Sequence, residues 1–300
     1  MGTKKLDLAK GARGCLGIKL ADSWRNDPLS EVMTGNVVRI ASGATLYDAQ
    51  RVMTDAKLAR LVVTDKAGKL RAMITRRDLA RFLSRDKTGR PLDSIPVGEC
   101  MSAPTITLRP TDTIADAARL MDKKGISSIV VTDDGNEILG VVTKTDLCFH
   151  FSLFTSEEKV RDFMSHRVFT VKPTHSIFFV ASILARQGIS RVPVVDEKLR
   201  GIVTLSDITE SAPVMRPDIA PGRSDVQFYR GLLAPSAKLT AMTAADLMTP
   251  NPITISSEEP LSRAAELMIE HGISGLPVVD AKGRLHGMVT KTDIIRAITH

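Results

Sequence analysis

The stretch Gly201-Ile202-Val203-Thr204-Leu205-Ser206-Asp207 joins a short apolar strand to the start of a helix. A threonine three residues before an aspartate is typical of the capping box, in which the hydroxyl and the carboxylate bind unpaired amides at a helix N-terminus. Closely similar sequences recur at Gly140–Asp146 and Gly287–Asp293. A less similar version of the motif, with Arg77 before the aspartate, occupies Ala72–Asp78. The chain therefore contains four copies of one unit, each ending in this closing motif.

Each copy opens at a methionine followed by serine or threonine, about 45 residues before its aspartate. The hydrophobic patterns between these ends predict a strand, a helix, a two-stranded hairpin and a final helix. A βαββα unit of this size buries too little apolar surface to be stable alone, so we expect the units to pair. The opening pairs are Met33-Thr34, Met101-Ser102, Met164-Ser165 and Met248-Thr249.

The spacing of the units predicts the domain organisation. We expect a basic N-terminal arm followed by two modules of two units each. The longest connection, which is rich in proline and arginine, is a linker or a partner-binding segment. The expected boundaries are 1–26 for the arm, 27–155 for the first module with units at 27–85 and 97–153, and 156–300 for the second module with units at 159–211 and 240–300 and the linker at 212–239.

Composition limits the class of protein. Hydrophobic residues make up 43% of the chain, which is enough for a packed core, and the formal net charge of +7 favours anionic partners. The three distant cysteines and six histidines lack metal-ligand spacing, and no P-loop, GxSxG elbow or HExxH motif occurs. No apolar run is long enough to span a bilayer. We therefore expect a cytoplasmic, non-catalytic protein without metal or membrane insertion.

The closing motif has two interpretations. It caps a helix in either case, and it also offers the chemistry that recognises a nucleotide. Helix N-terminal amides and hydroxyls bind phosphate, and a carboxylate accepts hydrogen bonds from the two vicinal hydroxyls of a ribose. The candidate ribose and phosphate ligands are Thr75, Asp78, Thr143, Thr145, Asp146, Thr204, Ser206, Asp207, Thr290, Thr292 and Asp293.

A second recurring element, an isoleucine followed by a serine, precedes the hairpin in three units. The aliphatic side chain either holds the face of a flat base or simply packs between helix and strand. These residues are Ile126 and Ser127, Ile189 and Ser190, and Ile273 and Ser274. Basic residues near the two elements either contact phosphate or are solvated surface charges. They are Arg60, Arg76, Arg77, Lys144, Arg191 and Lys291.

Together the four closing motifs, the Met-[Ser/Thr] openings and the Ile-Ser-x-x-Pro-Val-Val runs resemble the cystathionine β-synthase (CBS) domain family, over about residues 27–300. The resemblance implies an α/β (α+β) fold of four tandem CBS units paired into two Bateman modules. The modules would form a flat disk within one chain or across a homodimer. The resemblance also implies that AMP, ADP, ATP or an S-adenosylmethionine derivative binds in clefts between paired units. The aspartates would bind ribose, and the Ile-Ser element would border the adenine in the cleft of the opposite unit.

The resemblance implies a sensor that transmits the occupancy of these clefts to a separate effector protein. The alternative from another class is a nucleic-acid-binding protein that uses its basic surface. Aromatic residues make up only 4% of the chain, which limits stacking platforms for bases, and no base-reading motif is present. We therefore favour the nucleotide sensor.

Overall fold

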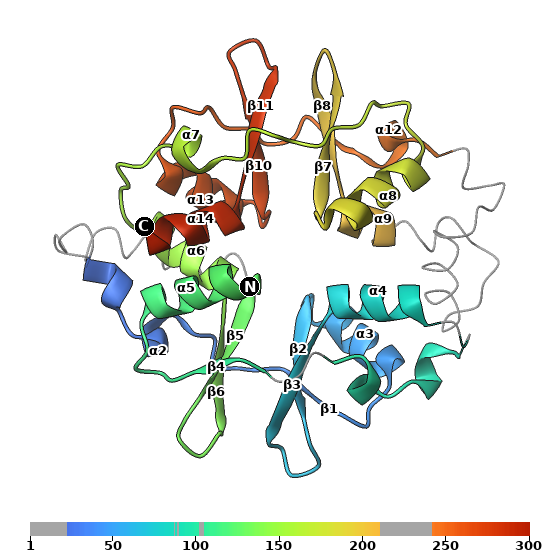
Figure 1. Ribbon diagram of the computed structural model, residues 1–300, viewed down its shortest axis with the longest axis vertical. Helices are drawn as coiled ribbons and strands as arrows, with labels where there is room; N and C mark the ends of the chain where they lie inside the picture. Colours follow the sequence, from blue (N-terminus) through green and yellow to red (C-terminus); the bar gives the residue numbers. More distant parts are fainter. Residues whose placement is uncertain (1–22, 87, 89, 102–104, 211–241) are drawn as a thin grey trace.

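The computed structural model describes residues 23–86, 88, 90–101, 105–210 and 242–300 (Figure 1). Most of the expected N-terminal arm, the expected linker at 212–239 and Ser102 of the second opening pair lie outside these residues. Within the described ranges, no helix is both long and apolar enough to cross a membrane. The same residues contain no group of three or more histidine, cysteine or acidic side chains arranged to hold a metal ion.

The described elements follow the expected order in all four units, except for the opening strand of the third and fourth units. After a short helix α2 (Leu29–Val32), the first unit contains β1 (Arg39–Ala41), α3 (Leu46–Asp55), β2 (Arg60–Thr64), β3 (Leu70–Thr75) and α4 (Arg76–Arg85). The second contains β4 (Thr107–Leu108), α5 (Ile114–Lys124), β5 (Ser128–Thr132), β6 (Ile138–Thr143) and α6 (Lys144–Ser152). The third contains α7 (Val160–Phe163), α8 (Ile177–Gln187), β7 (Arg191–Asp196), β8 (Lys198–Thr204) and α9 (Leu205–Glu210). The fourth contains α12 (Ala244–Leu247), β9 (Thr249–Pro250), α13 (Leu261–Glu270), β10 (Gly275–Val279), β11 (Leu285–Thr290) and α14 (Lys291–Thr299).

A hairpin forms the centre of every unit. Its two strands pair antiparallel, and the last residue of the second strand leads directly into the final helix. In the first two units the opening strand joins the hairpin in parallel, as β1-β2-β3 and β4-β5-β6. In the other two units, the expected opening strands are reduced to single parallel bridges, Val171 to Val194 and Ile255 to Val278.

The Met-[Ser/Thr] opening of one unit pairs with the hairpin of the neighbouring unit, and we call this arrangement the exchange of openings. Thr34, from the first opening, bridges Val141 in the second unit, and the third and fourth units exchange openings in the same way through Ser165 and β9. A Cβ atom at Gly140 would lie 2.7 Å from Sδ of Met33. The glycine of the closing motif therefore makes room for the methionine of the other unit. This exchange explains why the two motifs recur together.

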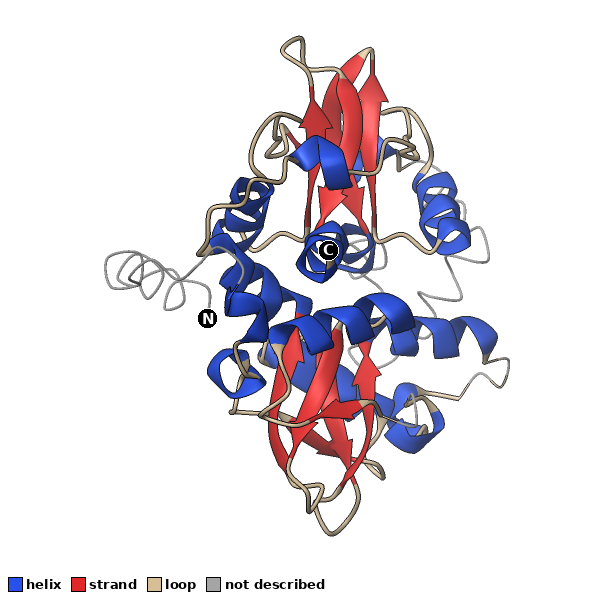
Figure 2. Ribbon diagram, turned by 60° about the vertical axis from the view of Figure 1, so that its left-hand side comes forward, coloured by secondary structure: helices blue, strands red, loops and turns tan. Residues whose placement is uncertain are grey.

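The units pair through their sheets. A small core of Val62, Met73, Val130 and Ile138 lies between the hairpins of the first and second units. In the third and fourth units, the hairpin tips meet where the Leu199 amide donates a hydrogen bond of 3.2 Å to the Gly283 carbonyl. The fold therefore consists of two modules, each built from consecutive units. Figure 2 shows the helices of both modules in the middle of the molecule and the hairpins pointing away from them.

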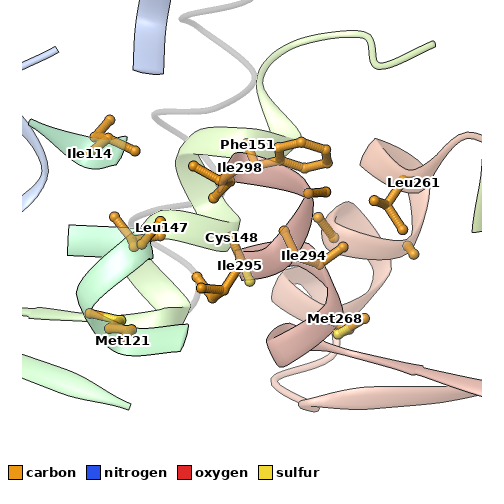
Figure 3. Packing of buried hydrophobic residues seen from close by; sticks show 14 of the residues in the cluster. Ile114, Met121, Leu147, Cys148, Phe151, Leu261, Met268, Ile294, Ile295 and Ile298 are labelled. Atoms are coloured by element: carbon orange, nitrogen blue, oxygen red, sulfur yellow. The ribbon is translucent and has the colours of Figure 1, made fainter. Parts of the chain in front are cut away.

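The two modules pack together through their second and fourth units. Helices α5 and α6 pack against α13 and α14, and their apolar residues form one continuous core. Figure 3 shows Cys148 and Phe151 of α6 facing Ile294, Ile295 and Ile298 of α14. The first and third units instead have separate cores. Burial of apolar surface in the second and fourth units therefore joins the modules within one chain.

Residues Ser23–Asn26, at the start of the described chain, pack against the contact between the two modules. The Trp24 side chain is 2% exposed and stacks on Phe154 with ring centroids 5.3 Å apart. Arg25 Nε donates a hydrogen bond of 3.2 Å to the Ile298 carbonyl at the end of α14. The sequence analysis placed these residues in the basic arm. In the structure Ser23–Asn26 form a 3₁₀ turn that packs on both modules.

We expect Trp24→Ala to lower the free energy of unfolding by about 3–5 kcal/mol, because the change leaves a cavity in the core that joins the modules. Urea unfolding followed by circular dichroism measures the effect. Phe169→Ala is the control: its side chain is 48% exposed, so we expect a change within about 0.5 kcal/mol. Equal effects of the two substitutions would show that Trp24 is not part of the core.

The glycine of the closing motif gives a second test. A Cβ atom at Gly287 would lie 2.8 Å from the Ser165 carbonyl oxygen and 3.0 Å from Sδ of Met164. Gly287→Ala should therefore cost about 1–3 kcal/mol of stability through overpacking. A matched Gly43→Ala variant adds its methyl group where no atom lies within 4 Å, and it should unfold like the wild type. Wild-type stability of Gly287→Ala would contradict the exchange of openings.

Candidate functional site

The closing motif forms a capping box in all four units. The backbone amides of Thr75, Thr143, Thr204 and Thr290 donate to Oδ2 of the aspartate three residues later, at 2.9, 2.9, 2.7 and 2.8 Å. The structure thus confirms the capping interpretation. The same box starts α3 at Thr45 and Asp48, in a helix with no predicted ligand role. The box therefore positions the carboxylates but does not by itself identify a site.

The four aspartates differ in their surroundings. Asp146 and Asp293 are only 5% and 2% exposed, whereas Asp78 and Asp207 are half-buried. Burial raises the pKa of Asp293, although hydrogen bonds from Thr290 oppose the shift. Oδ1 of Asp293 also lies 3.3 Å from Nη1 of Arg296. The aspartates of the second and fourth units are therefore buried, and we call their closing motifs the sheltered pair. Those of the first and third units are more open.

The structure brings the Ile-Ser element, and Leu58-Ala59 at the same position of the first unit, next to the closing motif. The first amide of the final helix donates to the carbonyl of the residue before the hairpin. The bonds are Arg76 to Ala59 (3.0 Å), Lys144 to Ser127 (3.1 Å), Leu205 to Ser190 (2.9 Å) and Lys291 to Ser274 (3.2 Å). Ile126, Ile189 and Ile273 are half-buried beside these contacts. Side chains suited to a base and to a sugar phosphate therefore share one region of each unit.

Two arginines cross from one unit to its partner. Arg60, at the start of β2, donates through Nη1 to the Ser127 carbonyl at 2.7 Å. Arg191, at the start of β7, donates to Oγ of Ser274 at 2.5 Å and approaches the Gly275 carbonyl at 3.5 Å. The sequence showed only that these arginines stand beside their own Ile-Ser position. Sheet pairing places them at the equivalent position of the other unit.

Two lysines cross between the modules. Nζ of Lys144, on α6, lies 3.0 Å from Oγ1 of Thr292 on α14. Nζ of Lys291, on α14, lies 3.1 Å from Oγ1 of Thr145 on α6. These partners are separated by about half of the chain, so no local sequence signal predicts the contacts. They depend on the packing of α6 against α14.

We call Arg60, Lys144, Arg191 and Lys291 the central basic cluster. Burial lowers the pKa of each of the four side chains below its ordinary value. For Lys291 the nearby charges of Arg191 and Arg60 lower the pKa further. Cations that are partly removed from water and that repel one another favour an anion among them. The geometry and the electrostatics thus both indicate an anion-binding centre.

The remaining predicted phosphate contacts make other contacts, although Thr75 lies opposite Arg60 in the pairing of β2 with β3. Arg76 approaches the Met53 carbonyl of α3 at 3.4 Å, and Arg77 is exposed. Thr75 is half-buried in its capping box, and Ser206 is exposed at the start of α9. The structure therefore groups only part of the predicted set, and the roles of these residues stay predictions.

A surface hollow of about 230 Å³ lies elsewhere in the second module, near the tips of its two hairpins. Its lining includes His166, Glu197, Arg284 and His286. The sequence analysis predicted none of these residues. Since the closing motifs follow the opposite ends of β8 and β11, this hollow is separate from the candidate site.

The family model of the CBS domain matches residues 29–85, 97–152, 160–213 and 244–300. The chain therefore belongs to the CBS domain family and contains four CBS domains. The matched ranges coincide with the four repeated units and include all four closing aspartates. The expected α/β fold of four tandem units is confirmed.

Relatives share this organisation over nearly the whole chain. The uncharacterized protein MJ1225 of Methanocaldococcus jannaschii is 26% identical over 274 residues, which cover 87% of this chain and 94% of that protein. The crystal structure of MJ1225, proposed as an archaeal homolog of g-AMPK, matches with a TM-score of 0.73 at 25% identity and covers 90% of this chain and 99% of its own. A protein of Pyrococcus horikoshii, 20% identical, shares the fold with a TM-score of 0.65 over 90% of this chain and 99% of its own.

The pKa shift of Lys291 predicts a pH effect on stability. Because its pKa is lower in the folded state, the unfolded chain holds more protons at alkaline pH, and this lysine contributes more stability as pH rises through its folded pKa. Lys291→Met should lack that gain. Urea unfolding from neutral to alkaline pH should therefore show that the variant loses stability relative to the wild type as pH rises. Lys66→Met, at an exposed position, should show no such trend. A difference independent of pH at Lys291 would contradict the shift.

Proposed function

We propose that this chain is a regulatory protein that binds adenine nucleotides in the clefts between paired CBS domains, with the phosphates at the central basic cluster. The observation that carries the proposal is the convergence of four half-buried cations on capped helix N-termini. The family and the full-length likeness to a proposed homolog of g-AMPK support a regulatory nucleotide-binding role.

Phosphate recognition would use three features of the site. The N-terminal turns of α6 and α14 contribute the positive ends of their helix dipoles, whereas their first backbone amides already donate to Ser127, Ser274 and the capping threonines. Thr145 and Thr292 add hydroxyls, each already within 3.1 Å of a lysine Nζ. Lys144 and Lys291 supply charge in a partly desolvated setting, where the attraction to an anion is stronger than in water. An incoming phosphate would relieve the mutual repulsion of these cations.

The sugar and the base would use the neighbouring elements. Oδ2 of each closing aspartate is held by its capping box, so the carboxylate has a fixed orientation toward a ribose. The half-buried isoleucines beside the capping boxes offer an apolar surface to the adenine ring. In this arrangement Asp78, Asp146, Asp207 and Asp293 bind ribose hydroxyls, and Ser127, Ser190 and Ser274 border the base.

Charge distinguishes among the adenosyl ligands. AMP, ADP and ATP carry negative phosphates that match the central basic cluster. S-adenosylmethionine carries a sulfonium, an ammonium and a carboxylate, so its net charge is positive and the same cations repel it. We therefore propose AMP, ADP or ATP in preference to S-adenosylmethionine at the sites beside Lys144 and Lys291. Occupancy would regulate a separate effector protein by favouring one arrangement of the modules, to the extent that the ligand binds that arrangement more tightly.

Calorimetric titration of AMP, ADP, ATP and S-adenosylmethionine into the full chain tests the proposal. Asp146→Asn and Asp293→Asn keep an oxygen for the capping box but remove the carboxylate charge. Losing a charge-assisted bond to ribose should weaken nucleotide binding roughly ten- to a hundredfold. Asp48→Asn is the matched control, because it changes an equivalent capping box in α3.

The outcomes separate the competing functions. Wild-type affinity in both Asp146→Asn and Asp293→Asn would leave these aspartates with a capping role only. If none of the adenosyl ligands binds the wild type, the nucleotide assignment is wrong. Binding to nucleic acid that falls steeply with added salt would instead support the alternative of a basic nucleic-acid-binding surface.

A further inference from the structure

The two lysines of the central basic cluster contact the motif of the opposite module. Lys144 belongs to the closing motif of the second unit, yet its Nζ donates to Thr292 in the motif of the fourth unit. Lys291 belongs to the fourth unit and donates to Thr145 of the second. Each threonine stands one residue before the aspartate of its motif. A group bound at either threonine hydroxyl therefore lies within reach of a lysine from the other module.

We infer that each sheltered nucleotide site is completed by a lysine from the opposite module: Lys291 binds the phosphate of the nucleotide held at Asp146, and Lys144 binds the phosphate of the nucleotide held at Asp293. The inference rests on the proposed function, since it assigns residues within the same sites. The sequence alone gives these lysines as candidate phosphate contacts and does not assign either of them to a particular site.

The charges around each lysine agree with this crossed assignment. Asp146 is the closing aspartate that raises the pKa of Lys291, in opposition to the dominant effect of burial. For Lys144 the corresponding closing aspartate is Asp293. Each lysine thus interacts electrostatically with the aspartate of the other module, in agreement with the two hydrogen bonds.

The packing that brings each lysine to the opposite module lies between the second and fourth units. Sγ of Cys148, in the apolar seam between α6 and α14, lies 3.8 Å from the Lys291 carbonyl. Arg296 of α14 also pairs with Asp122 of α5 at 3.4 Å. In the first and third units the residues equivalent to the lysines are Arg76 and Leu205. Leu205 has no side-chain donor, so the third unit cannot make the same exchange.

A nucleotide at either sheltered site would therefore contact both modules at once. Its phosphate would bridge the motif of one module and the lysine of the other, so binding would stabilise the docked arrangement. Conversely, the undocked modules would bind the nucleotide more weakly, by the same factor by which the nucleotide favours the docked arrangement. The crossed lysines thus provide a direct physical link between occupancy and module arrangement.

Crossed pairs of substitutions test the assignment, with AMP as the probe and the full chain as the protein. Asp146→Asn leaves Asp293 as the intact sheltered site, and Asp293→Asn leaves Asp146. In the Asp146→Asn background, Lys144→Met should weaken the remaining AMP binding about ten- to a hundredfold, whereas Lys291→Met should change it little. In the Asp293→Asn background, the effects of the two lysine substitutions should be reversed.

Two further measurements guard the interpretation. Urea unfolding of each variant identifies any loss of binding that comes from misfolding, and Lys144→Arg and Lys291→Arg should keep more of the affinity than the methionine variants. If each lysine instead affects the site of its own motif, the crossed assignment is wrong while the proposed function stands. If AMP binds but neither lysine affects its affinity, the crossed assignment and the placement of the phosphates at these lysines are both wrong, while nucleotide binding itself stands. If AMP, ADP and ATP all fail to bind the wild type, the proposed function itself fails.

Discussion

The packing of α6 against α14 is the interaction on which the rest of the molecule depends. It joins the second and fourth CBS domains into one apolar core, which Trp24 seals from the outside. The same packing shelters Asp146 and Asp293 and carries Lys144 and Lys291 to the threonines of the opposite module. Burial of apolar surface thus holds half-buried cations close together, and a bound anion would relieve their mutual repulsion.

The repeat, the order of elements and the capping role of the closing motif could be predicted from the sequence because they are local. A threonine three residues before an aspartate determines where a helix starts, and apolar spacing determines which face it buries. The exchange of methionine openings was not predicted. The recurrence of a methionine opening together with a glycine in the closing motif, as in Met33 and Gly140, is the sequence feature that could have indicated it. Only the structure shows that a Cβ atom at this glycine would meet a side chain from the neighbouring unit.

The candidate site was predictable in its residue types but not in its connections. The sequence gives Arg60, Arg191, Lys144 and Lys291 as candidate phosphate contacts, but it does not show which unit each side chain reaches. The arginines reach the partner unit because the sheets pair, and the lysines reach the other module because α6 meets α14. Such contacts join residues far apart in the chain, so they depend on the assembled core and not on any local pattern.

A crystal structure of the chain with bound AMP tests the central claim most directly. The account predicts phosphate density at the central basic cluster, within hydrogen-bonding distance of Lys291 and Thr145 at one site and of Lys144 and Thr292 at the other. The ribose should lie against Asp146 or Asp293. AMP bound instead in the hollow near His166 and His286, with the central cluster empty, would contradict the account.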